Sequence, residues 1–175
     1  MVVVHVQAAE SEEFLYECPS SSTIDEIADS MCDIATLQSK IHTLSRLLRR
    51  RALMDDAFRE SYPDVALALE RTLSEAEVYA SKDQVQYKRF LSPHALRAHI
   101  KSIEKEVKGS QLMSLSDLNL SQFFSDSEHH DGMQLWWAGK ELVRGKRLSD
   151  YIGENEKTKV GVLCRIKVIH FWGIP

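Results

Sequence analysis

The sequence contains few of the residues that cross-link or interrupt a chain. Its 175 residues include three cysteines, four prolines and seven glycines. Cys18, Cys32 and Cys164 are odd in number and lack the spacing of a disulfide framework, which favours a reduced, cytosolic setting. No run approaches the ~18 apolar residues of a membrane span, and Met1–Val6 lacks the basic flank of a signal peptide. These absences predict a soluble intracellular protein without membrane insertion.

Motifs of common enzymes are also missing. The chain has no glycine-rich phosphate loop, no G-x-S-x-G and no H-E-x-x-H. His129-His130-Asp131 has the side chains of a metal site, but adjacent histidines without a supporting ligand are more typical of a solvated loop. Cys18 or Cys32 could meet His5 as a nucleophile and base, although small core cysteines are commoner. We therefore expect no catalytic, cofactor or metal site and no small-molecule substrate.

The net charge of −4 is distributed unevenly along the chain. Between Gln134 and Ile169 there are eight Lys and Arg residues and only four Asp and Glu residues, so this segment is basic and the remainder of the chain is acidic. This asymmetry indicates either an acidic partner for the C-terminal half or two halves that pack on each other. Because the whole chain is acidic and no glycine-flanked aromatic motif accompanies the basic residues, we expect no nucleic-acid partner.

Four arginines lie close together in a predicted helix: Arg46, Arg49, Arg50 and Arg51. Such a run could bind phosphate or an acidic tail. Asp55, Asp56 and Glu60 follow shortly afterwards, so a solvated helix face with balanced charges is the favoured interpretation.

The first part of the chain predicts a hairpin followed by a helix. Met1–Val6 is β-branched, and Phe14–Cys18 has the composition of a second strand. Thr23 and Glu26 have the spacing of a capping box, so a helix should begin at Ile24. Its apolar residues recur every three or four positions, as expected for one buried face: Ile24, Ile27, Met31 and Ile34.

The middle of the chain predicts further helices. The first helix is expected to end near Thr36–Ser39, and an apolar helical pattern then continues from Ile41 to Phe58. Tyr62-Pro63 should end that pattern and open a helix over Asp64–Tyr79, and Ser92-Pro93 should open another that ends at Gly109. Their predicted inward residues are Val65, Leu69, Leu73 and Ala76 in the first and Leu96, Ile100, Ile103 and Val107 in the second.

The C-terminal part predicts strands. Leu135-Trp136-Trp137 is a short apolar run that ends at a turn containing Gly139, and Gly145 marks a second turn. Thr158–Val168 alternates apolar and polar residues, which is the period of a half-buried strand. By the same alternation, Leu135 and Trp137 should enter the core and Trp136 should point outward. Alternatively, the helical segment folds back and covers Trp136.

Two resemblances follow from these residues. Ala138-Gly139-Lys140, Leu142, Leu148-Ser149-Asp150-Tyr151 and Thr158 resemble the C-terminal half of a ubiquitin-like β-grasp. Gln134-Leu135-Trp136-Trp137-Ala138, Lys140-Glu141-Leu142, Leu148-Ser149-Asp150-Tyr151 and Asn155-Glu156-Lys157-Thr158-Lys159 are still more similar to the signature of the Kurly family, cilia- and flagella-associated protein 298. The first thirty or so residues also resemble the start of a ubiquitin-like fold, whereas the intervening segment does not.

These resemblances imply an α+β fold, a ubiquitin-like β-grasp split by an α-helical insertion. Residues 1–36 and 133–169 would form the grasp, 37–132 the insertion and connector, and 170–175 a tail. The chain lacks a C-terminal Gly-Gly, so it is not expected to be a conjugated modifier. Members of the Kurly family continue much further than this sequence, which suggests a fragment or short isoform.

The Kurly resemblance implies a non-enzymatic factor for cilium motility. It would act in cytoplasmic assembly of outer dynein arms, lie near the basal body, and bind dynein assembly factors or subunits. The ubiquitin resemblance implies an interaction surface around Trp136, with Val162 as its second member. The predicted partner-binding residues also include Lys140, Arg144 and Arg147 of the basic C-terminal half. One alternative is a generic ubiquitin-like adaptor that docks on a chaperone or proteolysis machine; another is a small enzyme that uses Cys18 or Cys32.

Overall fold

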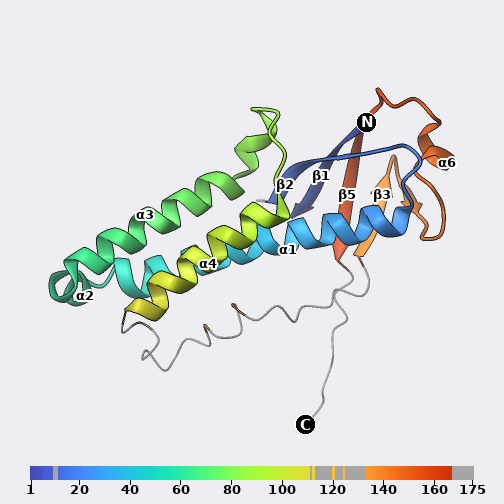
Figure 1. The fold of residues 1–175 in the computed structure, drawn as a ribbon. Helices are drawn as coiled ribbons and strands as arrows, with labels where there is room; N and C mark the ends of the chain where they lie inside the picture. The colour runs from blue at the N-terminus through green and yellow to red at the C-terminus, as the bar shows by residue number, and fades with distance from the viewer. Residues whose placement is uncertain (10–11, 111, 113–119, 121–123, 125–132, 167–175) are drawn as a thin grey trace, which may run out of the picture. The chain divides into compact units, whose positions relative to one another are not determined.

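The computed structural model describes residues 1–9, 12–110, 112, 120, 124 and 133–166 (Figure 1). The chain divides into two compact units, one formed by Met1–Cys32 and His129–Pro175 and the other by Asp33–Glu128. The first contains a mixed β-sheet and the second is helical, so the predicted α+β class is confirmed. Within the described residues, no helix is both long enough and apolar enough to cross a membrane.

Both ends of the chain contribute to one five-stranded sheet. Its strands are β1 (Val2–Ala9), β2 (Glu12–Cys18), β3 (Met133–Trp137), β4 (Lys140–Leu142) and β5 (Lys159–Ile166). The spatial order is β2-β1-β5-β3-β4, in which β1 and β5 are parallel and the other neighbours are antiparallel. The predicted hairpin of β1 and β2 is confirmed, and the N-terminal strand lies beside the last described strand in the centre of the sheet.

The first helix, α1 (Ile24–Leu48), begins at the predicted capping box. Thr23 Oγ1 accepts from the Glu26 backbone N–H at 3.3 Å, and the Glu26 carboxylate accepts from the Thr23 N–H at 3.2 Å. The predicted exit at Thr36–Ser39 is wrong, because the helix continues without interruption to Leu48. The apolar period explains the continuation, since Ile34 and Ile41 are separated by two helical turns.

Among its described residues, the helical unit contains the remainder of α1 and five further elements. They are the π-helical turn η1 (Arg49–Leu53), α2 (Asp56–Ser61), α3 (Pro63–Ala80), the 3-10 helix η2 (Lys82–Val85) and α4 (Pro93–Gly109). Pro63 occupies the first turn of α3, as predicted, and Ser92 caps α4 by accepting from the Ala95 N–H at 3.4 Å. Asp55 caps α2, which ends the helical pattern predicted to run on to Phe58.

The predicted inward faces of α3 and α4 form much of this unit's core. Leu69, Leu73 and Ala76 are fully buried in α3, as are Leu96, Ile103 and Val107 in α4. Val65 is only half-buried, and the neighbouring Ala66 is buried instead. Gln38, a buried polar residue of α1, donates from Nε2 to the Ala80 carbonyl at 2.7 Å. This bond satisfies a backbone acceptor at the C-terminal end of α3.

Candidate functional site

The residues predicted to bind a partner lie on and around the β3–β4 hairpin. Trp137 pairs with Lys140 across a two-residue turn, in which Ala138 and Gly139 have φ values of 48° and 76°. Positive φ at both positions produces the twist that suits a tight hairpin. The turn predicted at Gly139 is therefore confirmed, and it places Lys140 on an exposed edge.

The loop after β4 is held against the start of α1. The Gly145 N–H donates to the Asp25 carboxylate at 2.6 Å, and the Ile24 N–H donates to the Lys146 carbonyl at 2.8 Å. The Leu148 N–H donates to the Ser22 carbonyl at 3.0 Å, and Thr23 and Arg147 form an isolated β-bridge. These bonds join segments more than a hundred residues apart and fix the loop's conformation.

Arg144 adds charge to this junction. Its guanidinium lies 3.2 Å from the Asp29 carboxylate and 3.4 Å from that of Asp25. The hydrogen bond from the Gly145 N–H, with further contributions from Arg144, lowers the pKa of Asp25. Arg144 thus neutralises acids of the chain itself, although it remains exposed. Lys140 and Arg147 are also exposed, so all three predicted basic residues are accessible on this unit.

Val162 does not belong to the same surface. Leu135 pairs with Leu142 and Cys164, and alternation places Val162, two residues before Cys164, on the same face as Leu135. That face is the core, in which Val162 is only 2% exposed. Trp136 instead pairs with Glu141 and Leu163 on the opposite face. Trp136 and Val162 therefore lie on opposite faces of the sheet, which disagrees with the prediction that both belong to one exposed surface.

The two tryptophans differ less in burial than the alternation of the strand predicted. Leu135 is buried, as expected, but Trp136 and Trp137 are both half-buried. The Trp137 side chain lies at the end of the short strand β3, where the turn begins, and this position explains its incomplete burial. Trp136 is half-buried and its indole nitrogen is buried; it is the aromatic residue among those predicted to bind a partner.

Glu156 joins the segment before β5 to the N-terminal part of the chain, and the sequence did not predict these contacts. Glu156 accepts from Ser20 Oγ at 2.6 Å and from the Ser20 N–H at 2.8 Å, and it lies 3.1 Å from the Met1 ammonium. The two hydrogen bonds from Ser20, followed by that from the ammonium, lower the pKa of Glu156 to about 2. The only sequence signal was the polar Ser20–Ser22 cluster, which indicates no particular partner.

The residues considered for chemistry are placed as follows. Cys18 and Cys32 are buried and form no disulfide among the described residues, and burial is the largest cause that raises the pKa of Cys18 to about 11. A thiol with this pKa is protonated at neutral pH and is a weak nucleophile. His5 Nε2 lies 3.1 Å from the Glu13 carboxylate. Among the described residues, no three His, Cys, Asp or Glu side chains are grouped to hold a metal ion; His129-His130-Asp131 lies outside them.

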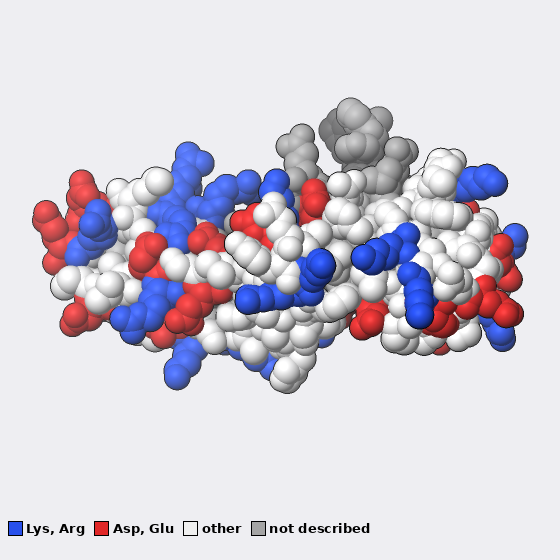
Figure 2. All heavy atoms as spheres, turned by 90° about the horizontal axis from the view of Figure 1, so that it is seen from above, with Lys and Arg blue, Asp and Glu red and all other residues white. Residues whose placement is uncertain are grey.

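Arg49 differs from the other members of the predicted arginine run, Arg46, Arg50 and Arg51, which are exposed. Arg49 is half-buried and donates to Glu70, Ser74 and Glu77 of α3. Hydrogen bonding to Glu77 and then to Glu70 raises the pKa of Arg49. Its balancing acids are therefore on α3, and not among Asp55, Asp56 and Glu60. Figure 2 shows Lys and Arg interspersed with Asp and Glu, so the visible face has no extensive patch of one sign.

Comparison with known proteins identifies one family at the hairpin. The family model described as "Cilia- and flagella-associated protein 298" matches residues 133–167, which contain β3, β4, the anchored loop and β5. The mouse protein of that name is 24% identical over an alignment of 216 positions. The alignment covers 91% of this chain and 74% of the relative. The zebrafish protein is 25% identical over 219 residues with the same coverage.

A shorter stretch is more strongly similar. Cilia- and flagella-associated protein 298-B of Xenopus laevis is 74% identical over 27 residues, which make up 15% of this chain and 10% of the relative. No solved structure matches the chain. The resemblance to the cilia- and flagella-associated protein 298 family is therefore confirmed at the level of sequence.

Proposed function

We propose that this chain is a non-enzymatic factor for motile cilia that acts in the assembly of outer dynein arms. The observation that carries the proposal is the match of residues 133–167 to the cilia- and flagella-associated family. Relatives with cilia- and flagella-associated names align over most of the chain and support a cilium-related role. The proposed locations are the cytoplasm, the cilium or flagellum and the basal body, and the proposed partners are dynein assembly factors or dynein subunits.

The candidate surface supports a binding role. On the hairpin and its following loop, Trp136 is half-buried and Lys140, Arg144 and Arg147 are exposed. The register pairs Lys140 with Trp137, so its side chain lies on the strand face opposite to that of Trp136. Aromatic and arginine side chains contribute most to many protein interfaces. Contacts with the start of α1 hold the loop in place, so little ordering entropy is lost when a partner binds.

The proposed fold is a ubiquitin-like β-grasp interrupted by the helical segment. The order β2-β1-β5-β3-β4, the parallel β1–β5 pair and the helix after the first hairpin support this interpretation. The same features support the alternative function, a ubiquitin-like adaptor for a chaperone or proteolysis machine. Affinity capture of the full chain from ciliated cells distinguishes the two: dynein subunits and assembly factors favour the first, and segregase or proteasome components favour the second.

A genetic rescue tests the proposal directly. Cells without the gene product should still build cilia, but these should beat poorly and have fewer outer dynein arms in electron micrographs. The wild-type chain and Cys18→Ala should restore beating, because the buried thiol has no proposed role, whereas Trp136→Ala should restore it poorly. Trp136→Phe keeps an aromatic surface and should give intermediate rescue.

Two results would contradict the proposal. Cilia with normal arms and normal beating in the complete absence of the gene product would remove the assembly role. Full rescue by Trp136→Ala, with the variant protein at wild-type abundance, would exclude Trp136 from the interface. Thermal unfolding of purified Trp136→Ala separates lost binding from lost stability, since part of this side chain is buried.

A further inference from the structure

One stretch of the helical unit carries a marked excess of positive charge. Residues Ile34–Met54, which form the second half of α1 and then η1, contain five Lys and Arg residues and no Asp or Glu. The whole chain has a net charge of −4, and the first part of α1, Ile24–Asp33, contains four acids and no Lys or Arg. The basic stretch lies outside residues 133–167, so the hairpin surface proposed above does not account for it.

The structure separates Arg49 from the other arginines of this stretch. The Arg49 side chain is 28% exposed and donates to two glutamates and a serine of α3, which neutralise its charge. Arg46, Arg50 and Arg51 are exposed instead, and none of them forms an ion pair with any residue that the structure describes. Arg46 and Arg50 lie about one helical turn apart, and Arg51 adjoins Arg50. We call these three residues the arginine cluster.

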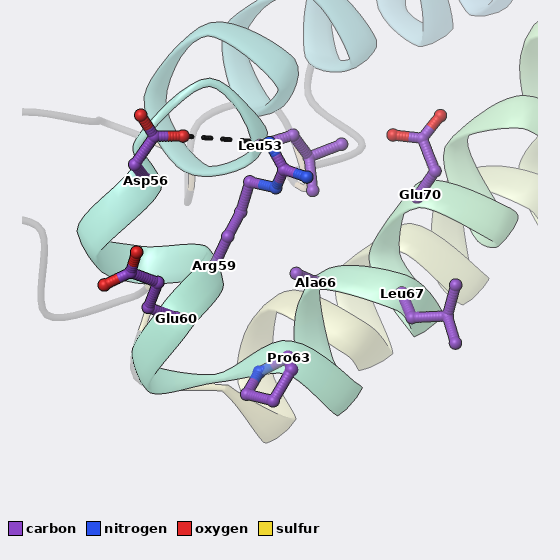
Figure 3. Close-up of a pocket in the computed structure, with 8 residues that line it drawn as sticks. All are labelled: Leu53, Asp56, Arg59, Glu60, Pro63, Ala66, Leu67 and Glu70. Atoms are coloured by element: carbon purple, nitrogen blue, oxygen red, sulfur yellow. Dashed lines mark ion pairs between the residues drawn. The ribbon is translucent and has the colours of Figure 1, made fainter.

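The acids that follow the arginine cluster do not neutralise it by ion pairing. The Asp55 carboxylate accepts from the Ala57 N–H at 3.0 Å and caps α2. Asp56 lies 3.8 Å from Arg59, a pair that Figure 3 shows as a dashed line beside the hollow near η1. Glu60 is exposed and pairs with none of the three arginines. The arginine cluster therefore remains a cationic surface without a paired acid in the described part of the chain.

We propose that the arginine cluster binds a short acidic segment of a partner protein. Guanidinium groups pair with carboxylates through charge-assisted hydrogen bonds, which are often bidentate. A single exposed ion pair contributes little to binding, because water and salt compete with it. A segment with several Asp or Glu residues contacts all three arginines at once, whereas a small anion such as phosphate does not. Charge and exposure together favour the acidic segment.

The charge of the remaining chain disfavours longer polyanions. The four acids of Ile24–Asp33 belong to the same helix as Arg46, and the net charge of the whole chain is negative. A nucleic acid or an anionic membrane extends well beyond three side chains and is repelled by this negative charge. A short peptide segment can remain beside the arginine cluster. The occupant is therefore assigned as protein.

A selection with a matched depletion step tests the proposal on the full chain. Random peptides are first depleted on the double variant Arg46→Glu with Arg50→Glu, and binders are then selected on the wild-type chain. The depletion removes peptides that bind elsewhere, so we expect the selected peptides to be enriched in Asp and Glu. In fluorescence anisotropy, the affinity of a selected peptide should weaken as salt increases, and replacing its acids by Asn and Gln should abolish binding.

Charge reversals at the same spacing on another helix provide the control. Lys101 and Lys105 are exposed one turn apart on α4, so Lys101→Glu with Lys105→Glu changes the net charge by the same amount. The arginine double variant should reduce the affinity at least about tenfold, whereas the lysine double variant should retain wild-type affinity. Arg46→Lys with Arg50→Lys keeps the charge but not the forked hydrogen bonds, so its loss should be smaller. Far-UV circular dichroism should show all variants with wild-type helix content.

Several outcomes would overturn the proposal. They are a selection that yields no binder or yields binders without an acidic bias, and equal losses of affinity in the arginine and lysine double variants. Displacement of a selected peptide by an equal concentration of inorganic phosphate would identify a phosphate site instead, and tighter binding of a single-stranded oligonucleotide would identify a nucleic-acid site. Self-association of the wild-type chain in sedimentation experiments, abolished in the arginine double variant, would make a second copy of this chain the occupant.

Discussion

The arrangement of the sheet predicts that one small change in β1 weakens the structure around the C-terminal tryptophans. Val4 is fully buried and lies between Tyr16 of β2 and Val160 of β5. Val4→Ala removes two carbon atoms from this position, which costs about 1.6 kcal/mol in lost apolar burial. An incompletely closed cavity adds up to about 1 kcal/mol. We therefore expect a decrease of about 2 to 3 kcal/mol in the free energy of unfolding of this unit.

Urea unfolding monitored by tryptophan fluorescence measures this effect. Two of the chain's three tryptophans, Trp136 and Trp137, lie in β3 and none lies in β1, so their fluorescence reports on the C-terminal strands. With a slope of about 2 kcal/mol per molar urea, the midpoint should decrease by roughly 1 M. Gln7→Ala changes an exposed position of the same strand and should leave the midpoint nearly unchanged. An unchanged fluorescence transition in Val4→Ala would refute the sheet that joins the two chain ends.

Three further changes probe single interactions. Thr23→Ala should lower the unfolding free energy by about 1 kcal/mol because it removes a helix cap, and Thr23→Ser should not; equal stability of both variants would contradict the capping role. Glu156→Gln should destabilise the chain at neutral pH, whereas Glu154→Gln should not. The pKa of Glu156 is lowered from 4.5 to about 2 in the folded chain, so the difference in unfolding free energy between wild type and Glu156→Gln should disappear as pH falls through this window. Urea titrations measure this difference, and a difference that does not change with pH would contradict the stabilising role of the Glu156 contacts. Arg49→Lys should cost roughly 1 kcal/mol because Lys cannot reproduce the forked contacts with Glu77, whereas the exposed Arg50→Lys should cost nothing measurable by thermal unfolding.

Features with a local cause were predictable from the sequence. The Thr23 and Glu26 capping box, the proline in the first turn of α3 and the serine cap of α4 each depend on residues within a few positions of one another. The two-residue turn at Gly139 belongs to the same group, because glycine readily adopts the positive φ that the hairpin requires. Periodicity likewise identified the buried faces of α3 and α4.

Features that depend on distant partners were missed or misplaced. Nothing near Arg49 indicates that Glu70 and Glu77 will surround it, and no motif links Ser20 to Glu156. The interruption at η1 has no glycine or proline to announce it. Val162 was misplaced for a different reason. A change of one residue in register exchanges the two faces of a strand, so a correct strand assignment still allowed the wrong face.

The anchored loop shows why the matched segment cannot be considered in isolation. The family model covers residues 133–167, yet the loop within this segment is held by Asp25 and by the backbone around Ser22. Val160 and Val162 are buried beside Val4 and Val6 of the N-terminal strand. The hairpin surface therefore depends on residues outside the matched segment for its shape, and substitutions at Asp25 should alter partner binding without contacting a partner.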